Sequence, residues 1–386
     1  MTVKKICVVI TARPSYARIR TALAAIRDDD RLELQLVVAA SALLDKYGAT
    51  VDVIEKEGFK VDRRVYSILD GENLVTSAKS TGFGLAELAT VFDDLKPDMV
   101  VTIADRFETM ATAVASAYLN IPLVHIQGGE VTGSIDDRVR HAITKLADVH
   151  LVSSEGAATR VKRMGEADDR VFVTGCPSID IARLVKQQPR PDIASLLAKS
   201  GGVGADLDIS DGYIVVLQHP VTTEYEQART HINETLHAIK DANYPTLWFW
   251  PNVDAGSDGT SGGIRAFREQ HKLENVHFYK NLAPEHFLHV LIASKGIIGN
   301  SSAAIRECSY LGVPAVNIGT RQRGRDRGPN VIDVAPVNAE IKQAIEQNYA
   351  RGQVKTSTTY GDGFAAQRIA DILATVNPGL EKPIVY

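Results

Sequence analysis

Short apolar runs rich in β-branched residues recur along the chain, and stretches with helical spacing separate them. In the first half these runs occupy residues 6–10, 34–39, 99–103, 122–126, 149–152 and 171–174. Residues 106–119 and 137–147 instead place alanine and other apolar side chains three and four positions apart, which predicts amphipathic helices. This alternation indicates βαβ units built around a parallel sheet.

The same alternation starts again in the second half, with apolar runs at residues 213–217, 246–250, 276–278, 296–298, 315–318 and 331–334. Between the two series, residues 186–192 are polar and contain Pro189 and Pro191, which interrupt helices and strands alike. The length of 386 residues also exceeds what one hydrophobic core usually supports. We therefore expect two Rossmann-like, doubly wound α/β domains, residues 1–188 and 189–386, facing each other across a ligand-binding cleft. The last helix is expected to pack back on the N-terminal domain.

Composition and charge narrow the function classes. Hydrophobic residues make up 45% and charged residues 23% of the chain, as in ordinary globular proteins. A net charge of −4 supplies no basic surplus for nucleic acid or for an anionic membrane. No apolar run approaches the roughly 18 residues that a membrane helix needs, and the three cysteines, Cys7, Cys176 and Cys308, lack the spacing of a metal site or a disulfide scaffold. We expect a cytoplasmic protein that takes a small-molecule substrate and requires neither a metal nor another cofactor.

A candidate anion site follows the apolar run at 296–298, where Gly299-Asn300-Ser301-Ser302 leads into a helix. Backbone N–H groups at a helix N-terminus, together with the helix dipole, can bind a diphosphate. Glu307 would repel phosphate but can accept hydrogen bonds from a ribose diol, so its position suggests a nucleotide. In the alternative interpretation, Ser301 only caps the helix and Glu307 is a solvated side chain.

A basic loop, Gly319 to Arg325, leaves the end of the run at 315–318. Ligands of open α/β sheets bind outside the carboxyl ends of the strands, so this loop belongs beside the serine motif. Arg321 is the expected phosphate partner. Arg323, Arg325 and Arg327 fit a solvated loop equally well, and we assign them no role.

Polar side chains also gather at strand ends in the first half. Asp105-Arg106 follows the run at 99–103, and Gln127-Gly128-Gly129-Glu130 follows the next run. Asp136 and Arg140 come shortly afterwards, so carboxylates are expected to converge at this edge of the sheet. Asp105 fits a helix N-cap equally well, whereas paired glycines permit a close backbone approach that a plain connection seldom requires.

Other strand ends carry polar groups in both halves. Arg13 follows the first run, while His219 and Asn252 follow the first two runs of the second half. Each of these is a weak signal alone. Their repetition at several strand ends points to one shared ligand site.

Several motifs, taken in order, resemble the hydrolysing UDP-N-acetylglucosamine 2-epimerase family. They are Asp105-Arg106-Phe107, Gly128-Gly129-Glu130, Ile135-Asp136-Asp137, Arg140-His141-Ala142-Ile143-Thr144, Gly175-Cys176-Pro177-Ser178, Gln218-His219-Pro220, Gly299-Asn300-Ser301-Ser302 and Gly319-Thr320-Arg321-Gln322. The resemblance runs from about residue 4 to Arg368-Ile369 and so covers nearly the whole chain. It implies a glycosyltransferase-B-like architecture, a homodimer or homotetramer, and release of UDP and N-acetylmannosamine for sialic-acid-type sugar synthesis.

The resemblance also implies residue roles, carried over by motif position. Asp105 and Asp136 would act on the sugar, with Glu130 and His219 as further catalytic candidates. The nucleotide-sugar would be held by Arg13, Arg106, Gln127, Arg140, His219, Asn252, Phe287, Ser301, Ser302, Glu307 and Arg321. Phe287 has the helical spacing of a core aromatic among Leu288, Val290 and Leu291, so only the resemblance favours it as a ligand contact.

Two positions depart from the family pattern. Ser15 replaces a frequent acidic residue, and Gln127 stands where some relatives have glutamate. Because Gln127 cannot transfer a proton, either Glu130 or Asp136 takes over that role or the sugar is different. The alternatives that stay open are a UDP- or GDP-linked 2,4-diacetamido substrate, a non-hydrolysing epimerase, a glycosyltransferase of the same fold, and a catalytically silent nucleotide-sugar sensor.

Overall fold

The computed structural model describes residues 3–70, 74–132, 135–251, 257–382 and 384–385. The chain divides into two compact units, the first comprising Met1–Glu130, Asp136–Asp180 and Gly361–Tyr386 and the second Val131–Ile135 and Ile181–Tyr360. The predicted boundary after residue 188 lies downstream of the change of unit, which occurs inside helix α7 (Pro177–Gln187). The reason is packing, since Ile181 and Val185 of α7 already belong to a core of the second unit.

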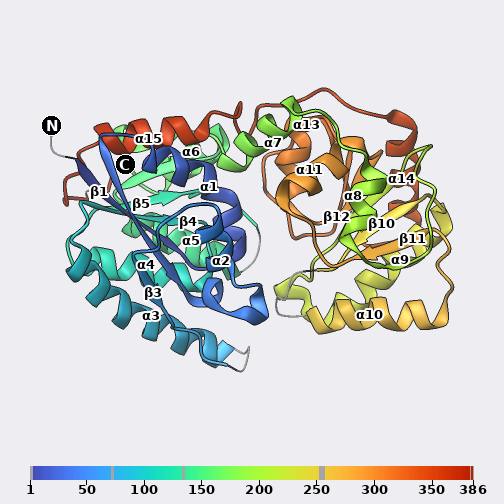
Figure 1. The fold of residues 1–386 in the computed structure, drawn as a ribbon, viewed down its shortest axis with the longest axis horizontal. Coiled ribbons are helices and arrows are strands. Elements are labelled where there is room, and N and C mark those ends of the chain that lie inside the picture. The colour runs from blue at the N-terminus through green and yellow to red at the C-terminus, as the bar shows by residue number, and fades with distance from the viewer. Residues whose placement is uncertain (1–2, 71–73, 133–134, 252–256, 383, 386) are drawn as a thin grey trace. The chain divides into compact units, whose positions relative to one another are not determined.

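The described part of the first unit contains a seven-stranded sheet in which every pair of neighbours is parallel (Figure 1). In spatial order the strands are β3 (Arg63–Val65), β2 (Leu32–Ala39), β1 (Lys4–Ile10), β4 (Met99–Ile103), β5 (Leu123–Ile126), β6 (Val149–Val152) and β7 (Val171–Val173). The predicted runs match these strands except for β3. This edge strand has only three residues, two of them exposed arginines, and so carries no apolar run.

Helices cover both faces of this sheet. They are α1 (Arg13–Arg27), α2 (Thr50–Lys56), α3 (Leu74–Leu95), α4 (Phe107–Tyr118), α5 (Ile135–Leu146), α6 (Glu155–Arg163) and α15 (Ala365–Thr375). Alternate residues of β1 point to opposite faces, as the two-residue period of a strand requires. Ile6 and Val8 pack in a core with α1 and α15, whereas Cys7 and Val9 pack in a core with α3 and α4. The last helix therefore completes the core of the first unit, and the Asp180 carboxylate accepts two backbone N–H bonds at its N-terminus.

The described part of the second unit contains another seven-stranded sheet. In spatial order its strands are β14 (Val331–Val334), β13 (Ala315–Ile318), β12 (Gly296–Gly299), β9 (Ile214–Leu217), β10 (Thr246–Phe249), β11 (Val276–Tyr279) and β8 (Val203–Gly204). Only β8, which has two residues and no predicted run, pairs antiparallel among the described strands. The helices are α8 (Ile193–Ser200), α9 (Ala228–Ala242), α10 (Ser257–Gln270), α11 (Pro284–Ala293), α12 (Ser302–Ile305), α13 (Glu307–Leu311) and α14 (Asn338–Arg351).

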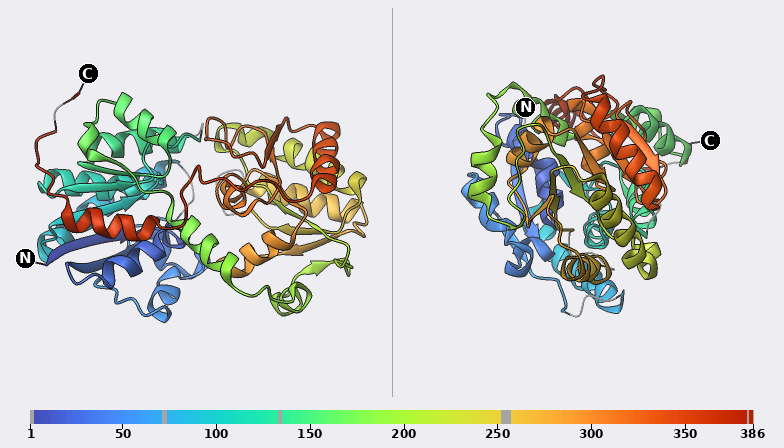
Figure 2. Two further views of the ribbon diagram at one scale, coloured as in Figure 1. Left: turned by 90° about the horizontal axis from the view of Figure 1, so that it is seen from above. Right: turned by 90° about the vertical axis from the view of Figure 1, so that its right-hand side faces the viewer.

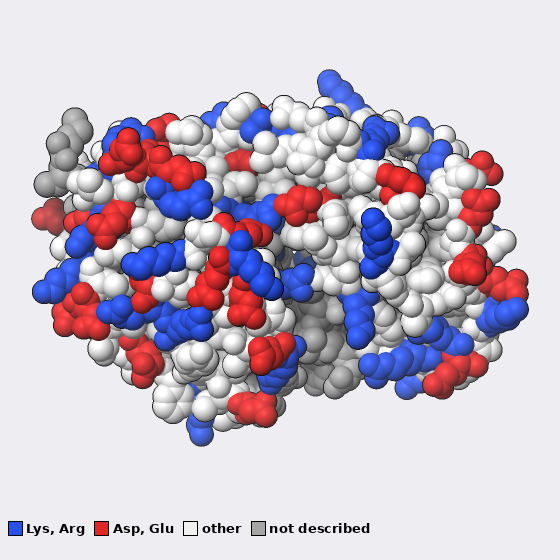
Figure 3. All heavy atoms as spheres, viewed as in Figure 1, with Lys and Arg blue, Asp and Glu red and all other residues white. Residues whose placement is uncertain are grey.

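The expected α/β class with two doubly wound, mostly parallel sheets is confirmed. Figure 2 shows helices on both faces of each sheet, and separate apolar cores fill the two faces of the second one. On the face drawn in Figure 3, acidic and basic side chains are interspersed and form no large area of one sign. Across the described ranges, no helix combines the length and the apolar character needed to cross a membrane.

Candidate active site

In the first unit, Asp105 lies at the carboxyl end of β4 and forms an ion pair with Arg140 of α5. The Arg140 guanidinium also donates to the Asp137 carboxylate at 2.5 Å and to the backbone carbonyl of Glu130 at 2.7 Å. Its side chain is only 1% exposed, whereas that of Asp105 is 15% exposed. Arg140 thus ties together the turns after β4 and β5 and the first turn of α5.

Two expectations concern this arrangement. Arg140 is expected to contact the nucleotide-sugar. Its guanidinium is buried against protein acceptors, and a role in binding a ligand stays a prediction. The expected gathering of carboxylates is present, because Asp105 and Asp137 both form an ion pair with Arg140.

The turn after β5 carries the predicted paired glycines and Gln127. Gln127 and Gly129 both adopt positive φ values, 67° and 73°. A Cβ at Gly129 would lie 2.3 Å from the Ala157 carbonyl oxygen, so the absence of a side chain lets this turn pack on α6. The Gln127 side chain is buried, and its amide donates to the Cys176 sulfur at 3.0 Å. Its role in binding a sugar stays a prediction.

The other basic candidates of the first unit lie at the same sheet edge. Arg13 is exposed and begins α1, directly after β1. Arg106 is the residue before α4, and its guanidinium lies 3.2 Å from the buried Glu108 carboxylate. Asp136 is on the first turn of α5, four residues before Arg140, so the two lie on the same side of the helix.

In the second unit, Asn300 at the end of β12 holds the predicted histidine and the basic loop together. Its side chain accepts from the His219 backbone N–H at 2.7 Å and donates to the His219 carbonyl at 2.8 Å. Its own carbonyl accepts from Gln322 at 2.8 Å and from Arg321 at 3.2 Å. Hydrogen bonds therefore join the carboxyl ends of β9, β12 and β13 into one polar network. The sequence predicts polar groups at these strand ends but does not identify Asn300 as the residue that connects them.

Burial, and after it the charge of Arg321, lower the pKa of His219 well below its usual value. His219 is therefore neutral at physiological pH. It can exchange hydrogen bonds with a ligand, but it supplies no positive charge for a diphosphate. In this network that charge comes from Arg321.

The serine motif begins α12 as expected. The Ser301 hydroxyl accepts from the Ala303 backbone N–H at 3.3 Å, so the capping interpretation is correct for this side chain. The Ser302 hydroxyl accepts from the Arg306 guanidinium at 2.9 Å. Within the described part of the chain, Oε2 of Glu307 is buried without a hydrogen-bond partner, which makes it a free acceptor for a ligand hydroxyl.

The comparisons with known proteins decide the family. A family model described as UDP-N-acetylglucosamine 2-epimerase matches residues 24–374. The chain belongs to this epimerase family. It is 30% identical over 374 residues to the UDP-N,N'-diacetylbacillosamine 2-epimerase (hydrolyzing) of Legionella pneumophila, covering 97% of this chain and 96% of the relative. It is also 30% identical over 351 residues to the GDP/UDP-N,N'-diacetylbacillosamine 2-epimerase (hydrolyzing) of Campylobacter jejuni, covering 90% and 88%.

A solved structure supports the fold of this epimerase family member. The UDP-GlcNAc 2-epimerase of Neisseria meningitidis bound to UDP-GlcNAc superposes with a TM-score of 0.80 at 18% identity, over 96% of this chain and 99% of that one. The resemblance drawn from the sequence motifs is thereby confirmed at the level of family and fold, and the protein is an enzyme of this family.

Two expected ligand contacts, Asn252 and Phe287, stay predictions. Asn252 lies outside the described residues. Phe287 on α11 is half-buried and packs edge to face on Phe249, with ring centroids 5.1 Å apart. That contact is the one expected of a core aromatic, and a role for Phe287 in stacking on a base stays a prediction.

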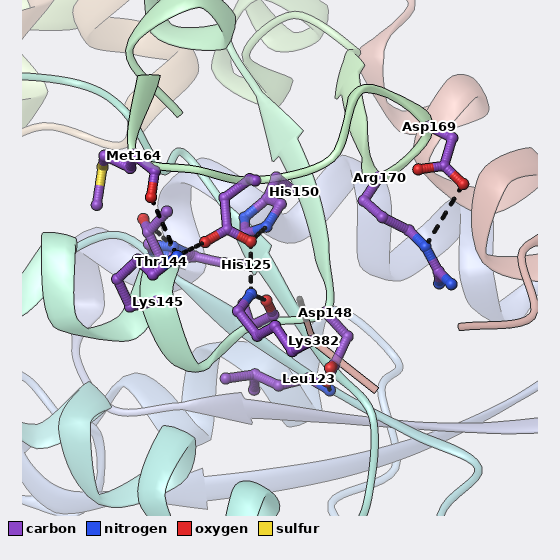
Figure 4. Close-up of polar contacts among 12 residues, drawn as sticks. Leu123, His125, Thr144, Lys145, Asp148, His150, Met164, Asp169, Arg170 and Lys382 are labelled. Carbon is purple, nitrogen blue, oxygen red and sulfur yellow. Dashed lines mark hydrogen bonds and ion pairs between the residues drawn. The ribbon is translucent and has the colours of Figure 1, made fainter. Parts of the chain in front are cut away.

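A separate buried charge cluster lies at the amino ends of β5 and β6, away from the carboxyl edge. Glu166, whose side chain is 4% exposed, binds Lys145 at 2.5 Å, His150 at 3.0 Å and Lys382 of the C-terminal segment at 2.6 Å. Figure 4 shows that the three partners come from different segments of the chain. Burial alone would raise the pKa of Glu166, but the hydrogen bonds from its three partners outweigh burial and lower the pKa to about 2.

Proposed function

We propose that this protein is a hydrolysing 2-epimerase that converts UDP-N-acetylglucosamine and water into N-acetylmannosamine and UDP. The observation that carries the proposal is the Asp105–Arg140 pair at the carboxyl edge of the first sheet, in a chain of this family. The guanidinium holds the carboxylate in place, while 15% of the Asp105 side chain is still exposed. A positioned and accessible carboxylate is what abstraction of a sugar proton requires.

The proposed reaction has two steps. Asp105 or Asp136 takes the proton from C2 of the sugar, the electrons of that C–H bond form a C1–C2 double bond, and the C1–O bond breaks so that UDP leaves. Water then adds to C1 of the glycal while a proton returns to C2 from the opposite face. The atoms balance as one nucleotide-sugar and one water giving one free sugar and one UDP.

The second unit is proposed to stabilise the leaving group. Arg321 and the backbone N–H groups after Asn300 would bind the diphosphate, with Ser301 and Ser302 beside them. Glu307, which has a buried acceptor oxygen without a described partner, would accept hydrogen bonds from the ribose. Preorganised donors of this kind are often worth about 3–4 kcal/mol each toward the transition state.

A second candidate substrate is a UDP- or GDP-linked 2,4-diacetamido sugar. The two relatives at 30% identity both carry names for such substrates. Gln127, in place of the glutamate of some relatives, is the residue in this chain that favours a different sugar. The chemistry at C2 and C1 would be the same for either substrate.

One assay separates the substrates and the reaction types. The wild-type protein is incubated in D₂O with UDP-N-acetylglucosamine and, separately, with a UDP-linked 2,4-diacetamido sugar, and the products are followed by NMR. The proposal requires a free sugar with inverted C2 that carries deuterium. An unlabelled free sugar would exclude the elimination, and a product that retains UDP would identify a non-hydrolysing epimerase.

Asp105→Asn tests the proposed base. The amide keeps the size of the side chain but cannot accept the C2 proton, so turnover should fall at least about a hundredfold, the low end of what a general base contributes. UDP affinity, measured by calorimetry, should stay at the wild-type value because UDP is assigned to the second unit. Near-normal turnover would remove Asp105 from the mechanism.

A further inference from the structure

The residue next to Asp105 has an unusual backbone. Ala104 adopts a φ of 67°, in the left-handed region that an alanine seldom occupies. It is 5% exposed, so its carbonyl needs a partner inside the protein. Such a conformation is strained and persists only where neighbouring groups enforce it. Its position directly before Asp105 means that it sets the direction in which this carboxylate leaves the sheet.

His125 of β5 supplies the enforcing contact. Its Nε2 lies 2.9 Å from the Ala104 carbonyl, and its Nδ1 lies 3.1 Å from the Thr144 hydroxyl of α5. A carbonyl can only accept, so Nε2 carries the proton and Nδ1 accepts from Thr144. The imidazole is completely buried, and burial lowers the pKa of His125 to about 4, which keeps the ring neutral at neutral pH. His125 and Thr144 are both labelled in Figure 4.

The surrounding backbone is built around this imidazole. A Cβ added to Gly128 would lie 3.0 Å from Nδ1 of His125 and 3.0 Å from the Thr144 hydroxyl. The first of the paired glycines therefore leaves room for the His125–Thr144 contact. Thr144 is four residues after Arg140, so one face of α5 reaches the Ala104–Asp105 corner twice, once through His125 and once directly.

We propose that His125 is a positioning residue for the epimerase reaction, which holds the left-handed Ala104 and thereby aims the Asp105 carboxylate at the sugar. This inference rests on the proposed function, since it assigns His125 a role in that reaction. His125 touches no reacting atom. It acts through a backbone carbonyl, and the Thr144 hydroxyl donates to its Nδ1 and orients the ring.

The test compares three variants of the full-length protein. His125→Asn shortens the side chain so that it no longer reaches the Ala104 carbonyl, whereas His125→Gln places an amide N–H near the position of Nε2. His277→Asn is the matched control, because the His277 imidazole also bonds a backbone carbonyl, that of Ala205 at 2.9 Å, but lies in the second unit outside the proposed site. Circular dichroism and UDP affinity establish that each variant is folded.

We expect His125→Asn to lower kcat by up to about a hundredfold, the loss that a displacement near 1 Å can cause, with UDP affinity unchanged. His125→Gln should recover most of the rate, and His277→Asn should match the wild type. In an Asp105→Asn background, His125→Asn should add no further loss. A normal kcat in folded His125→Asn, or the same fold-loss in both backgrounds, would overturn the proposal.

Histidine ¹⁵N NMR of the wild-type protein provides a readout that is independent of activity. It should show His125 protonated on Nε2 alone at pH 7, and a cationic ring or the Nδ1–H tautomer would overturn the positioning contact. If the wild type epimerises neither sugar but shows the Nε2–H tautomer, the proposed function fails while the Ala104 contact stands. The two failures are therefore distinguishable.

Discussion

Removal of Arg140 should destabilise the first unit strongly. Its guanidinium, 1% exposed, is paired with Asp105 and Asp137 and donates to the Glu130 carbonyl. Arg140→Met keeps a long, flexible stem but removes the charge and these donors. The substitution leaves two carboxylates without their common cation.

The size of the effect follows from burial. Removing one partner of a buried ion pair typically costs about 3–5 kcal/mol, because the remaining charge is desolvated and unpaired. Asp105 and Asp137 are 15% and 16% exposed, so water relieves part of that penalty and the lower end applies. A loss of about 3 kcal/mol corresponds to a fall in Tm of roughly 6–12 °C for a domain of about 200 residues.

The assay must distinguish the two units. Both tryptophans, Trp248 and Trp250, lie in the second unit, so tryptophan fluorescence reports its unfolding. Differential scanning calorimetry detects the unfolding of both units. The lowered Tm of Arg140→Met should appear in the calorimetric transition that tryptophan fluorescence does not report. Arg140→Lys is the matched variant. Lysine keeps the positive charge but lacks the planar guanidinium that donates to several acceptors at once, so its loss of stability should be intermediate.

The turnover of Arg140→Met provides the second readout. Because Arg140 holds Asp105, kcat should fall while UDP affinity stays near the wild-type value. A variant with normal kcat and an unfolding free energy within about 0.5 kcal/mol of the wild type, the range of an inconsequential surface change, would refute the role assigned to Arg140.

Three further predictions follow. The folded-state pKa of Glu166, about 2, lies below the ordinary carboxyl value, so the stability that this ionised group provides is complete above about pH 4.5 and is lost as the pH falls toward 2. In urea titrations, Glu166→Gln should therefore be less stable than the wild type at pH 7, and the difference should vanish near pH 2. In calorimetry, Glu307→Gln should weaken UDP binding about tenfold, near the upper end for a hydrogen bond to a neutral partner, but leave the binding of 2′,3′-dideoxy-UDP unchanged. Equal losses of affinity for both ligands would contradict the ribose contact. EDTA treatment should leave the epimerase rate unchanged, and a complete loss that Mg²⁺ restores would show that the chemistry needs a metal.

The central parallel strands were predictable because they are buried on both faces. Such strands appear as continuous apolar runs, and those at 99–103, 149–152 and 315–318 coincide with strands of the structure. The edge strands β3 and β8 were not predicted because they have only three and two residues and carry no apolar run. The change of unit inside α7 was not predicted, since the helix continues without a break across it.

The site was only partly predictable, because strand ends are visible in a sequence but contacts between strand ends are not. The positions of Asp105, His219 and Ser301 followed from the fold class and the resemblance. The burial of Arg140 and the bracing by Asn300 did not, since each depends on which side of its turn or helix the side chain takes. A buried arginine and an exposed, ligand-binding arginine look alike in sequence, and they differ only in what surrounds the guanidinium.

Helix α5 shows how these contacts are organised. Three of its polar residues, Arg140, Thr144 and Lys145, contact Asp105, His125 and Glu166 respectively. Arg140 lies in the middle of α5, and Thr144 and Lys145 are neighbours in its last turn, so the helix is held at two levels. It thereby joins the proposed catalytic corner to the Glu166 cluster, which also holds the C-terminal segment through Lys382. Because a displacement near 1 Å can cost a large part of the rate, these contacts of α5 account for a fixed Asp105 in the proposed reaction.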